Sequence, residues 1–183
     1  MGYSNARSYH PWLRDEFAFR CIYCLNREQW GRVTGEFDVE HFLSQARVPS
    51  LATIYSNLFN ACSRCNSAKG TREVPEPTKN LASQTIPIQS DGRLEPFTDE
   101  ARSLIEKLRL NSPSMVRWRL IWMRNIELAR EYDPEQFSRL MQYPDDLPNL
   151  ENLRPPEGNA KPEGIEQSYY MRRVNGTLPL MQH

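Results

Sequence analysis

The chain has 183 residues, of which 39% are hydrophobic and 10% aromatic, and this is enough for a packed core in one domain with additions. Its formal net charge is zero, which does not favour a stand-alone nucleic-acid-binding protein, because basic side chains supply most of the affinity for phosphates. It contains neither an apolar run of the roughly 18 residues that a membrane helix needs nor an apolar N-terminal signal, so we expect a soluble, cytoplasmic protein with no membrane contact.

The first 42 residues predict short elements. Residues 1–20 indicate a short helix or a lead-in segment, with Trp12, Phe17 and Phe19 as apolar anchors. Residues 32–42 alternate loosely around a glycine, Gly35, which predicts a strand or a hairpin.

The following segments predict a loop, a helix and an extended excursion. We expect a loop with a short element over residues 47–60 and a helix within residues 61–70 that Gly70 can end. Residues 71–97 have few periodic apolar positions, and we expect them to be extended with a turn at Asp91-Gly92.

Three helices are predicted next. Thr98 can cap the first of them, and Ser112, with Pro113 at the first helical position, can cap the second and longer one. Asp133-Pro134 opens a third helix that runs to about Met141. The expected apolar stripe of the long helix includes Val116, Leu120, Ile121, Met123 and Leu128.

Two features of the long helix allow more than one interpretation. Four arginines could form a face that binds a nucleic-acid backbone, or could simply be solvated: Arg117, Arg119, Arg124 and Arg130. Trp118 and Trp122, four residues apart, fit a core or an interface better than a platform for stacked bases.

The last segment is irregular and acidic. Residues 133–166 carry more acidic than basic side chains, and residues 143–164 are rich in Pro, Asn, Asp and Glu, which indicates a linker or an arm on the surface. Residues 168–181 predict a hairpin that turns at Asn175-Gly176. The side chains that could make this hairpin a docking or nucleic-acid patch are Tyr169, Tyr170, Arg172 and Arg173.

The four cysteines form two Cys-x-x-Cys pairs, Cys21 with Cys24 and Cys62 with Cys65. A cytosolic chain is not expected to contain structural disulfides. Two such pairs are typical of a tetrahedral zinc site with four thiolate ligands, which leaves no open position for catalysis. A redox-active or free-thiol function is the alternative.

Polar residues with the chemistry of phosphodiester hydrolysis lie between and after these pairs. Hydrolysis needs a base for the attacking water, and a histidine such as His41 titrates in the right range. It also needs a cation at the leaving oxygen, and oxygen ligands from Glu40 and Asn66 suit Mg²⁺ or Mn²⁺.

The whole pattern resembles the HNH, or ββα-metal, endonucleases of the subgroup with a four-cysteine zinc site. The matching segments are C21IYC24, E40H41, N57L58 and C62SRC65NSAK69G70, in the order that the family has them. The resemblance implies that His41 is the general base, that Glu40 and Asn66 bind one Mg²⁺ or Mn²⁺ ion, and that Asn57 orients the loop of His41. It also implies that the four cysteines bind structural zinc and that cleavage leaves 5′-phosphate and 3′-hydroxyl ends.

Some assignments stay open. The family usually has Asp before the histidine, where this chain has Glu40, so Asp38 is a rival metal ligand. Lys69 and Arg64 are possible contacts to nucleic-acid phosphates, or solvated charges of the helix surface.

The sequence therefore predicts an α+β fold with a small zinc-pinned ββα nuclease core over residues 1–75. A helical extension over residues 76–142 and a Pro-rich arm over residues 143–183, suited to docking on a partner, complete the expected domains. We expect a DNA endonuclease, and the resemblance implies the effector subunit of a prokaryotic antiviral defence complex controlled by a partner such as an ATPase. The alternative is an inactive zinc-ribbon-like adaptor or nucleic-acid-binding module.

Overall fold

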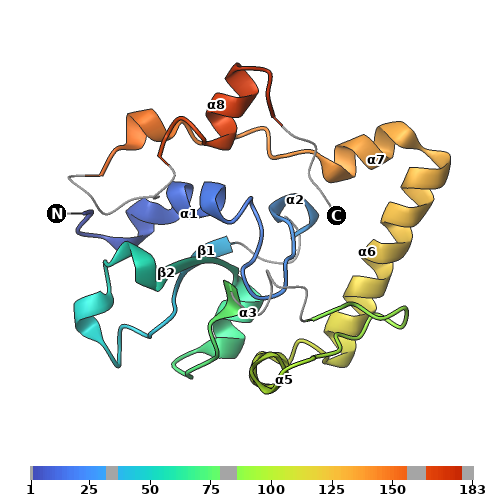
Figure 1. Cartoon of the computed structure of the whole chain (residues 1–183), viewed down its shortest axis with the longest axis horizontal. Coiled ribbons are helices and arrows are strands. Elements are labelled where there is room, and N and C mark those ends of the chain that lie inside the picture. The colour runs from blue at the N-terminus through green and yellow to red at the C-terminus, as the bar shows by residue number, and fades with distance from the viewer. Residues whose placement is uncertain (1, 32–36, 79–85, 156–163, 179–183) are drawn as a thin grey trace. The chain divides into compact units, whose positions relative to one another are not determined.

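A computed structural model describes residues 2–31, 37–78, 86–155 and 164–178. The fold class is α+β, as predicted, with a small antiparallel sheet and several helices (Figure 1). The chain divides into two compact units: residues 1–73 together with 143–183 make up unit 1, and residues 74–142 make up unit 2.

The sheet of unit 1 has two strands. Strand β1 (Phe37–His41) pairs antiparallel with β2 (Leu58–Cys62), so that Phe37 lies opposite Cys62 and His41 opposite Leu58. Of the strand or hairpin predicted over 32–42, the structure confirms the strand, whereas Gly35 lies outside the described residues.

Strand β2 leads without a break into helix α3 (Ser63–Lys69). Gly70 ends this helix with a φ of 54°, a backbone conformation that favours glycine, as the sequence predicted. The order β1-β2-α3 is thus the expected ββα arrangement.

The remaining elements of unit 1 are short helices. They are η1 (Ala6–Tyr9), α1 (His10–Glu16), α2 (Glu28–Gly31), η2 (Pro49–Leu51), η3 (Tyr55–Asn57), η4 (Leu150–Leu153) and α8 (Tyr169–Val174).

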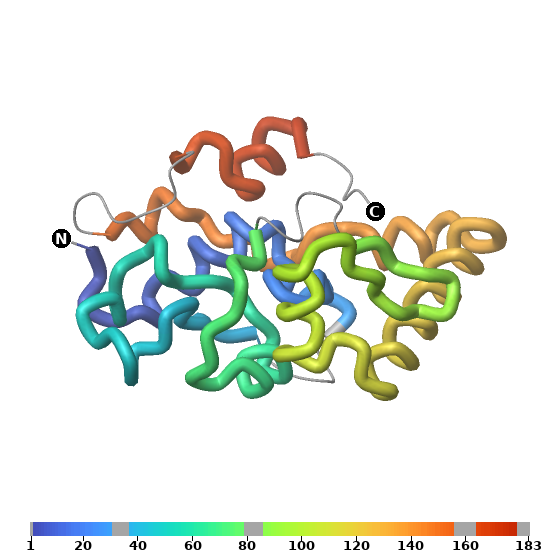
Figure 2. The backbone as a smooth tube through the Cα atoms, turned by 60° about the horizontal axis from the view of Figure 1, so that its bottom comes forward, coloured from blue at the N-terminus to red at the C-terminus, as the bar shows by residue number. Residues whose placement is uncertain are grey.

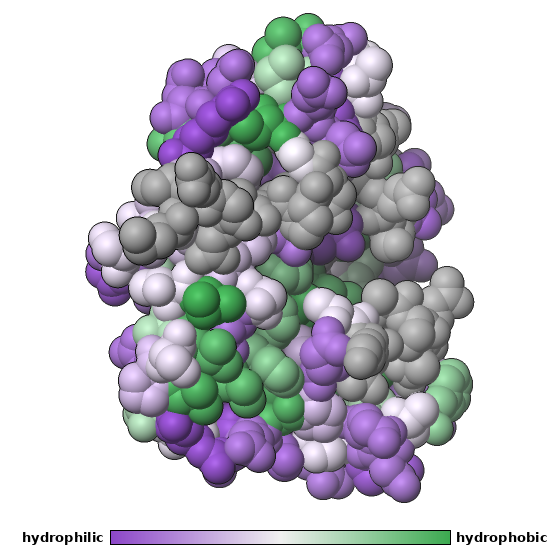
Figure 3. Space-filling view, turned by 60° about the vertical axis from the view of Figure 1, so that its left-hand side comes forward, coloured by the Kyte–Doolittle hydropathy of each residue, from purple (hydrophilic) through white to green (hydrophobic). Residues whose placement is uncertain are grey.

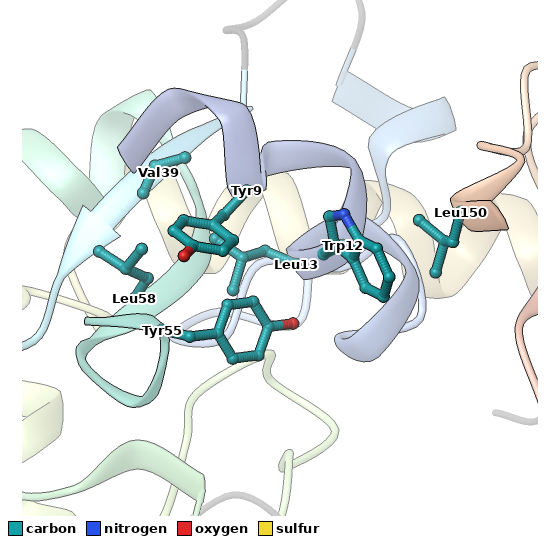
Figure 4. Close-up of a cluster of buried hydrophobic side chains, with 7 residues drawn as sticks. All are labelled: Tyr9, Trp12, Leu13, Val39, Tyr55, Leu58 and Leu150. Atoms are coloured by element: carbon teal, nitrogen blue, oxygen red, sulfur yellow. The ribbon is translucent and has the colours of Figure 1, made fainter. Parts of the chain in front are cut away.

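The main core of unit 1 lies between α1 and the sheet. Figure 4 shows Tyr9 and Leu13 pointing toward Leu58 and Tyr55, with Leu150 on the side of Trp12. Val39 of β1 completes this cluster of buried side chains. Burying an apolar side chain of this size contributes about 1.5–3 kcal/mol, so the cluster fixes the sheet against α1.

The segment that begins at residue 143 packs against α1 and does not extend as a free arm. The indole Nε1 of Trp12 donates to the carbonyl oxygen of Leu153 at 3.0 Å, and the carboxylate of Asp15 accepts from the backbone N–H of Tyr169 at 2.8 Å. Figures 1 and 2 both place this orange-to-red segment along the blue α1. Parts of unit 1 that lie far apart in sequence therefore share one core.

The predicted hairpin over residues 168–181 is wrong, because residues 169–174 form helix α8. The side chain of Ser168 accepts from the N–H of Met171 and caps this helix, and Asn175-Gly176 ends it, with a φ of 67° at Gly176. The Asn-Gly pair suits a hairpin turn and a helix C-terminus equally well, which explains the error. Residues 179–181 lie outside the described residues.

Unit 2 consists of α5 (Asp99–Lys107), α6 (Pro113–Tyr132) and α7 (Pro134–Met141), preceded by a turn at Gly92. The side chains of Thr98 and Asp133 cap α5 and α7 as predicted. Ser112 is the N-cap residue of α6, but its side chain makes no capping hydrogen bond.

The buried face of α6 differs from the predicted apolar stripe. Leu120, Ile121 and Leu128 are exposed, whereas Arg119 is buried. The guanidinium group of Arg119 donates to the carbonyl oxygens of Gly92 and, at 2.8 Å, of Leu110. Arg119 therefore joins α6 to the loops around α5 and is not available to a nucleic-acid backbone.

Part of the molecular surface is apolar. Figure 3 shows green, apolar side chains gathered in a patch with purple, polar ones around it. In the described part of the chain, no helix combines the length and the apolar character needed to cross a membrane.

Replacing Asp15 with alanine should destabilise unit 1. The change leaves the part-buried N–H of Tyr169 without its acceptor, which costs about 1–3 kcal/mol. Urea denaturation measures this cost. Asp146→Ala is the control, because the exposed Asp146–Arg14 pair contributes at most about 1 kcal/mol. Equal stability of the Asp15 variant and wild type would contradict the docking described above.

Replacing Arg119 with methionine should destabilise unit 2 by about 1–3 kcal/mol, because two buried carbonyl oxygens lose their donor. Thermal denaturation compares this variant with Arg117→Met, which removes an exposed arginine from the same helix. A Tm loss of the same size in both variants would argue against a structural function of Arg119.

Candidate active site and cysteine cluster

The four cysteines meet at the point where β2 becomes α3. Cys21 and Cys24 lie on the turn after α1, Cys62 ends β2, and Cys65 lies in α3. Their sulfur atoms all lie within 4.8 Å of one another, and the Sγ atoms of Cys24 and Cys62 are 3.8 Å apart. Because a disulfide needs about 2.05 Å, these are free cysteines positioned to bind a metal ion.

Backbone hydrogen bonds bring the two pairs together. The first pair lies on a tight turn, in which the N–H of Leu25 donates to the carbonyl oxygen of Cys21 at 2.9 Å and Leu25 itself has a φ of 58°. The N–H of Ile22 donates to the carbonyl oxygen of Asn60 at 2.9 Å, and this bond fixes the turn to strand β2.

The crowded thiols do not ionise alike. Hydrogen bonds from the other three cysteines hold the pKa of Cys62 far below its usual range. The pKa values of Cys24 and Cys65 are raised, because these thiols donate to neighbouring sulfurs and because they are buried.

His41 ends strand β1 and is half-buried. Its ring nitrogen Nε2 lies 2.9 Å from the carbonyl oxygen of Ala52. Because a carbonyl oxygen can only accept a hydrogen bond, Nε2 carries the proton and donates. The other nitrogen, Nδ1, then has a lone pair that can accept a proton.

Asn57 is buried beside the loop that follows His41. Its Oδ1 accepts from the N–H of Leu43 at 2.8 Å, while its Nδ2 donates to the carbonyl oxygens of Leu43 at 3.0 Å and Leu51 at 3.2 Å. All these bonds go to the loop between His41 and Ala52, so this side chain ties together the two ends of the loop that holds the imidazole.

Glu40 points away from the solvent, with only 3% of its side chain exposed. Its Oε1 lies 2.5 Å from the Nζ of Lys69 and accepts from the hydroxyl of Tyr23 at 3.4 Å. Burial raises the pKa of Glu40 above its usual range, and the bond to Lys69 opposes this effect. Burial and the nearby carboxylate also raise the pKa of Tyr23.

Lys69 is neither a contact for nucleic-acid phosphate nor a solvated charge of the helix surface, so both interpretations of the sequence are wrong for this residue. Its side chain is completely buried, and its Nζ also donates to the carbonyl oxygen of His41 at 2.7 Å. Arg64 lies half-buried on the same helix, so a contact of Arg64 to phosphate stays a prediction.

The two other candidate metal ligands are Asn66 and Asp38. Asn66 is half-buried on α3, one turn before Lys69. Asp38 is partly exposed, and its Oδ2 lies 3.7 Å from Arg7. The structure thus gives Asp38 and Glu40 different partners although both belong to β1.

Sequence reasoning missed Tyr23 entirely and misjudged Lys69. Tyr23 lies at one of the two positions between Cys21 and Cys24 that the Cys-x-x-Cys pattern leaves unspecified, so it gave no signal of its own. The spacing of Asn66 and Lys69, three residues apart on one helix, could have indicated that both face the same strand.

Comparison with known proteins agrees with this geometry. Residues 21–72, which contain both cysteine pairs, His41 and Asn57, match the family model described as HNH endonuclease. No curated protein matches the chain. The match covers less than half of the sequence, so the similarity to HNH endonucleases is limited to residues 21–72.

Proposed function

We propose that the protein is a divalent-metal-dependent endonuclease that hydrolyses phosphodiester bonds in DNA, with His41 as the general base. The hydrogen bond from Nε2 of His41 to the carbonyl oxygen of Ala52 is the observation that carries the proposal. It fixes the tautomer in which Nδ1 can take a proton from a water molecule. The water oxygen then bonds to phosphorus, and the bond from phosphorus to the 3′ oxygen breaks.

Asn57 is the proposed positioning residue for this base. Its three hydrogen bonds hold the loop that carries the carbonyl oxygen of Ala52. A base that is held in one orientation needs no reordering before it acts, and a displacement of about 1 Å can reduce a rate roughly a hundredfold.

Glu40 and Asn66 are the proposed ligands of one Mg²⁺ or Mn²⁺ ion. Both offer hard oxygen donors, and such donors suit these ions. Lys69 and Tyr23 occupy Oε1 of Glu40, and no other hydrogen bond of that carboxylate is found among the described residues, so Oε2 is the oxygen that fits a metal. When bound, the ion would stabilise negative charge on the phosphate and on the leaving oxygen.

The four cysteines are the proposed ligands of a structural zinc ion. Tetrahedral coordination with zinc–sulfur bonds of about 2.3 Å separates the sulfurs by about 3.8 Å. The Sγ atoms of Cys24 and Cys62 are 3.8 Å apart, which fits this geometry. Four thiolates fill the coordination sphere, so this ion would support the fold and take no part in hydrolysis.

The proposal includes a protein partner, a regulatory subunit such as an ATPase in a prokaryotic defence complex. Zero net charge and the acidic segment 133–166 support it, because an isolated chain of this kind should bind DNA weakly. Tight, salt-sensitive DNA binding by the purified chain alone would argue against a required partner.

Replacing His41 with alanine should abolish cleavage of supercoiled plasmid in Mg²⁺ or Mn²⁺, with a loss of roughly a hundredfold or more. His10→Ala is the matched control, because His10 lies on α1 outside the matched segment, and it should retain cleavage. Nicking that persists in the His41 variant would exclude this residue as the base. No cleavage by wild type or by any variant would fit either an inactive adaptor or an effector that lacks its partner, and a pull-down would then test for the partner.

Replacing Asn57 with alanine should reduce the cleavage rate more than it changes the affinity for plasmid, because the loop of His41 loses three hydrogen bonds. Steady-state cleavage and a filter-binding assay separate the two effects. A large loss of affinity with an unchanged rate would contradict a positioning function.

Removing the zinc should unfold unit 1. Metal analysis is expected to find one zinc ion per chain, and a strong chelator should lower the Tm, because the binding free energy of a structural zinc is part of the folding free energy. Cys65→Ser should show the same loss without chelator, and addition of Zn²⁺ should restore only the wild type. A chain that keeps its Tm after complete loss of zinc would contradict this assignment.

A further inference from the structure

We propose that Lys69 is a positioning residue of the same site: its buried ammonium group joins the carboxylate of Glu40 to the main-chain carbonyl of His41, and so sets the orientation of His41 relative to Asn66. This inference rests on the proposed function, because it assigns a task to Lys69 within that site.

Two short contacts carry the inference. Nζ of Lys69 lies 2.5 Å from Oε1 of Glu40 and donates to the carbonyl oxygen of His41 at 2.7 Å. The exposed fraction of the Lys69 side chain is 0%. An ammonium group has three donors, and a buried one needs acceptors for them, so Lys69 is confined to the point where it bridges two successive residues of β1.

Because Lys69 is the last residue of α3, its contacts to Glu40 and His41 attach the end of this helix to β1. The cysteine cluster holds this helix near its start, through Cys62 and Cys65, and Lys69 holds its end against β1. Asn66 lies between the two attachments. A helix of seven residues that is attached near both ends can neither rotate nor slide along the strand. The side chain of Asn66 and the backbone of His41 are thereby fixed relative to one another.

Lys69 also gives His41 a second point of attachment. The ring is held by the carbonyl oxygen of Ala52, and the main chain of the same residue is held by Lys69. When the main-chain contact is lost, the end of β1 can move, and the ring no longer has to keep its bond to Ala52. A purely structural ion pair would leave the state of the ring unchanged.

The test compares Lys69→Met, Glu40→Gln and the double variant that combines them, with Lys107→Met as the control for loss of an exposed lysine. Two-bond ¹H–¹⁵N NMR of the histidine rings reports which ring nitrogen carries the proton. The chain has only 3 histidines, and the signal that His41→Ala lacks identifies His41. This readout needs neither Mg²⁺ nor DNA.

We expect a single Nε2–H tautomer of His41 in wild type, in Glu40→Gln and in Lys107→Met, because Lys69 still reaches the carbonyl of His41 in each. In Lys69→Met we expect a mixture of tautomers. The same variant should lose at least tenfold in kcat for plasmid cleavage while its KM changes less than threefold.

The double variant keeps the test decisive if Lys69→Met alone does not fold. Lys69→Met alone leaves a buried carboxylate without its partner, which can prevent folding, whereas removal of both charges is far better tolerated. If only the double variant folds, a mixture of tautomers there, against a single one in Glu40→Gln, supports the proposal. An unchanged His41 signal in every folded variant that lacks Lys69 overturns it.

Failure of the proposed function can be told apart from failure of this inference. If His41→Ala cleaves plasmid as well as wild type does, the assignment of His41 as the general base fails. The tautomer of His41 with and without Lys69 is measured independently of cleavage, and it alone decides whether Lys69 positions the ring.

Discussion

Four sulfur atoms held within 4.8 Å of one another are the constraint on which unit 1 depends. Two of them come from the turn after α1 and two from the junction of β2 and α3, so the cluster joins the same two segments that the hydrogen bond from Ile22 to Asn60 holds together. Such crowding is unfavourable for thiolates unless a cation balances their charge. The cysteine cluster therefore helps to set the direction in which α3 leaves the sheet.

Because α3 starts at this cluster, its later residues reach β1 at a defined position. Glu40 connects the two regions, since its carboxylate contacts Lys69 at the end of α3 and Tyr23 within the first cysteine pair. One residue further along β1, the imidazole of His41 is held by a loop that Asn57 closes. The sheet has only two short strands, and side-chain contacts to two consecutive residues, Glu40 and His41, hold it in place.

The ends of several helices could be predicted from the sequence, because they depend on residues within one turn. Gly70 after α3, Thr98 before α5 and Asp133 before α7 act within one turn of the helix that each bounds, and the structure confirms all three. The cysteine pairs were equally clear, because their spacing is itself the geometry of a metal-binding turn.

Features that depend on distant partners could not be predicted. Lys69 and Arg119 looked like surface charges, but each is buried because carbonyl or carboxylate oxygens from another segment surround it. The end of α8 at Asn175-Gly176 was misread because this pair suits a hairpin as well. A sequence pattern can indicate that a residue lies on a helix. Only the tertiary structure shows which hydrogen-bond acceptors from other segments lie next to its side chain.

The return of residues 143–178 to α1 has a consequence for the synthesis of the chain. Unit 1 is interrupted in sequence by the whole of unit 2, and the acceptor oxygen for Trp12 belongs to Leu153. While the ribosome is still translating unit 2, α1 can pack against the sheet, but Trp12 and Asp15 still lack their partners from the segment after residue 143. Completion of unit 1 must therefore await a late stage of translation, and a product that ends prematurely within unit 2 would lack the surface that closes over Trp12 and Asp15.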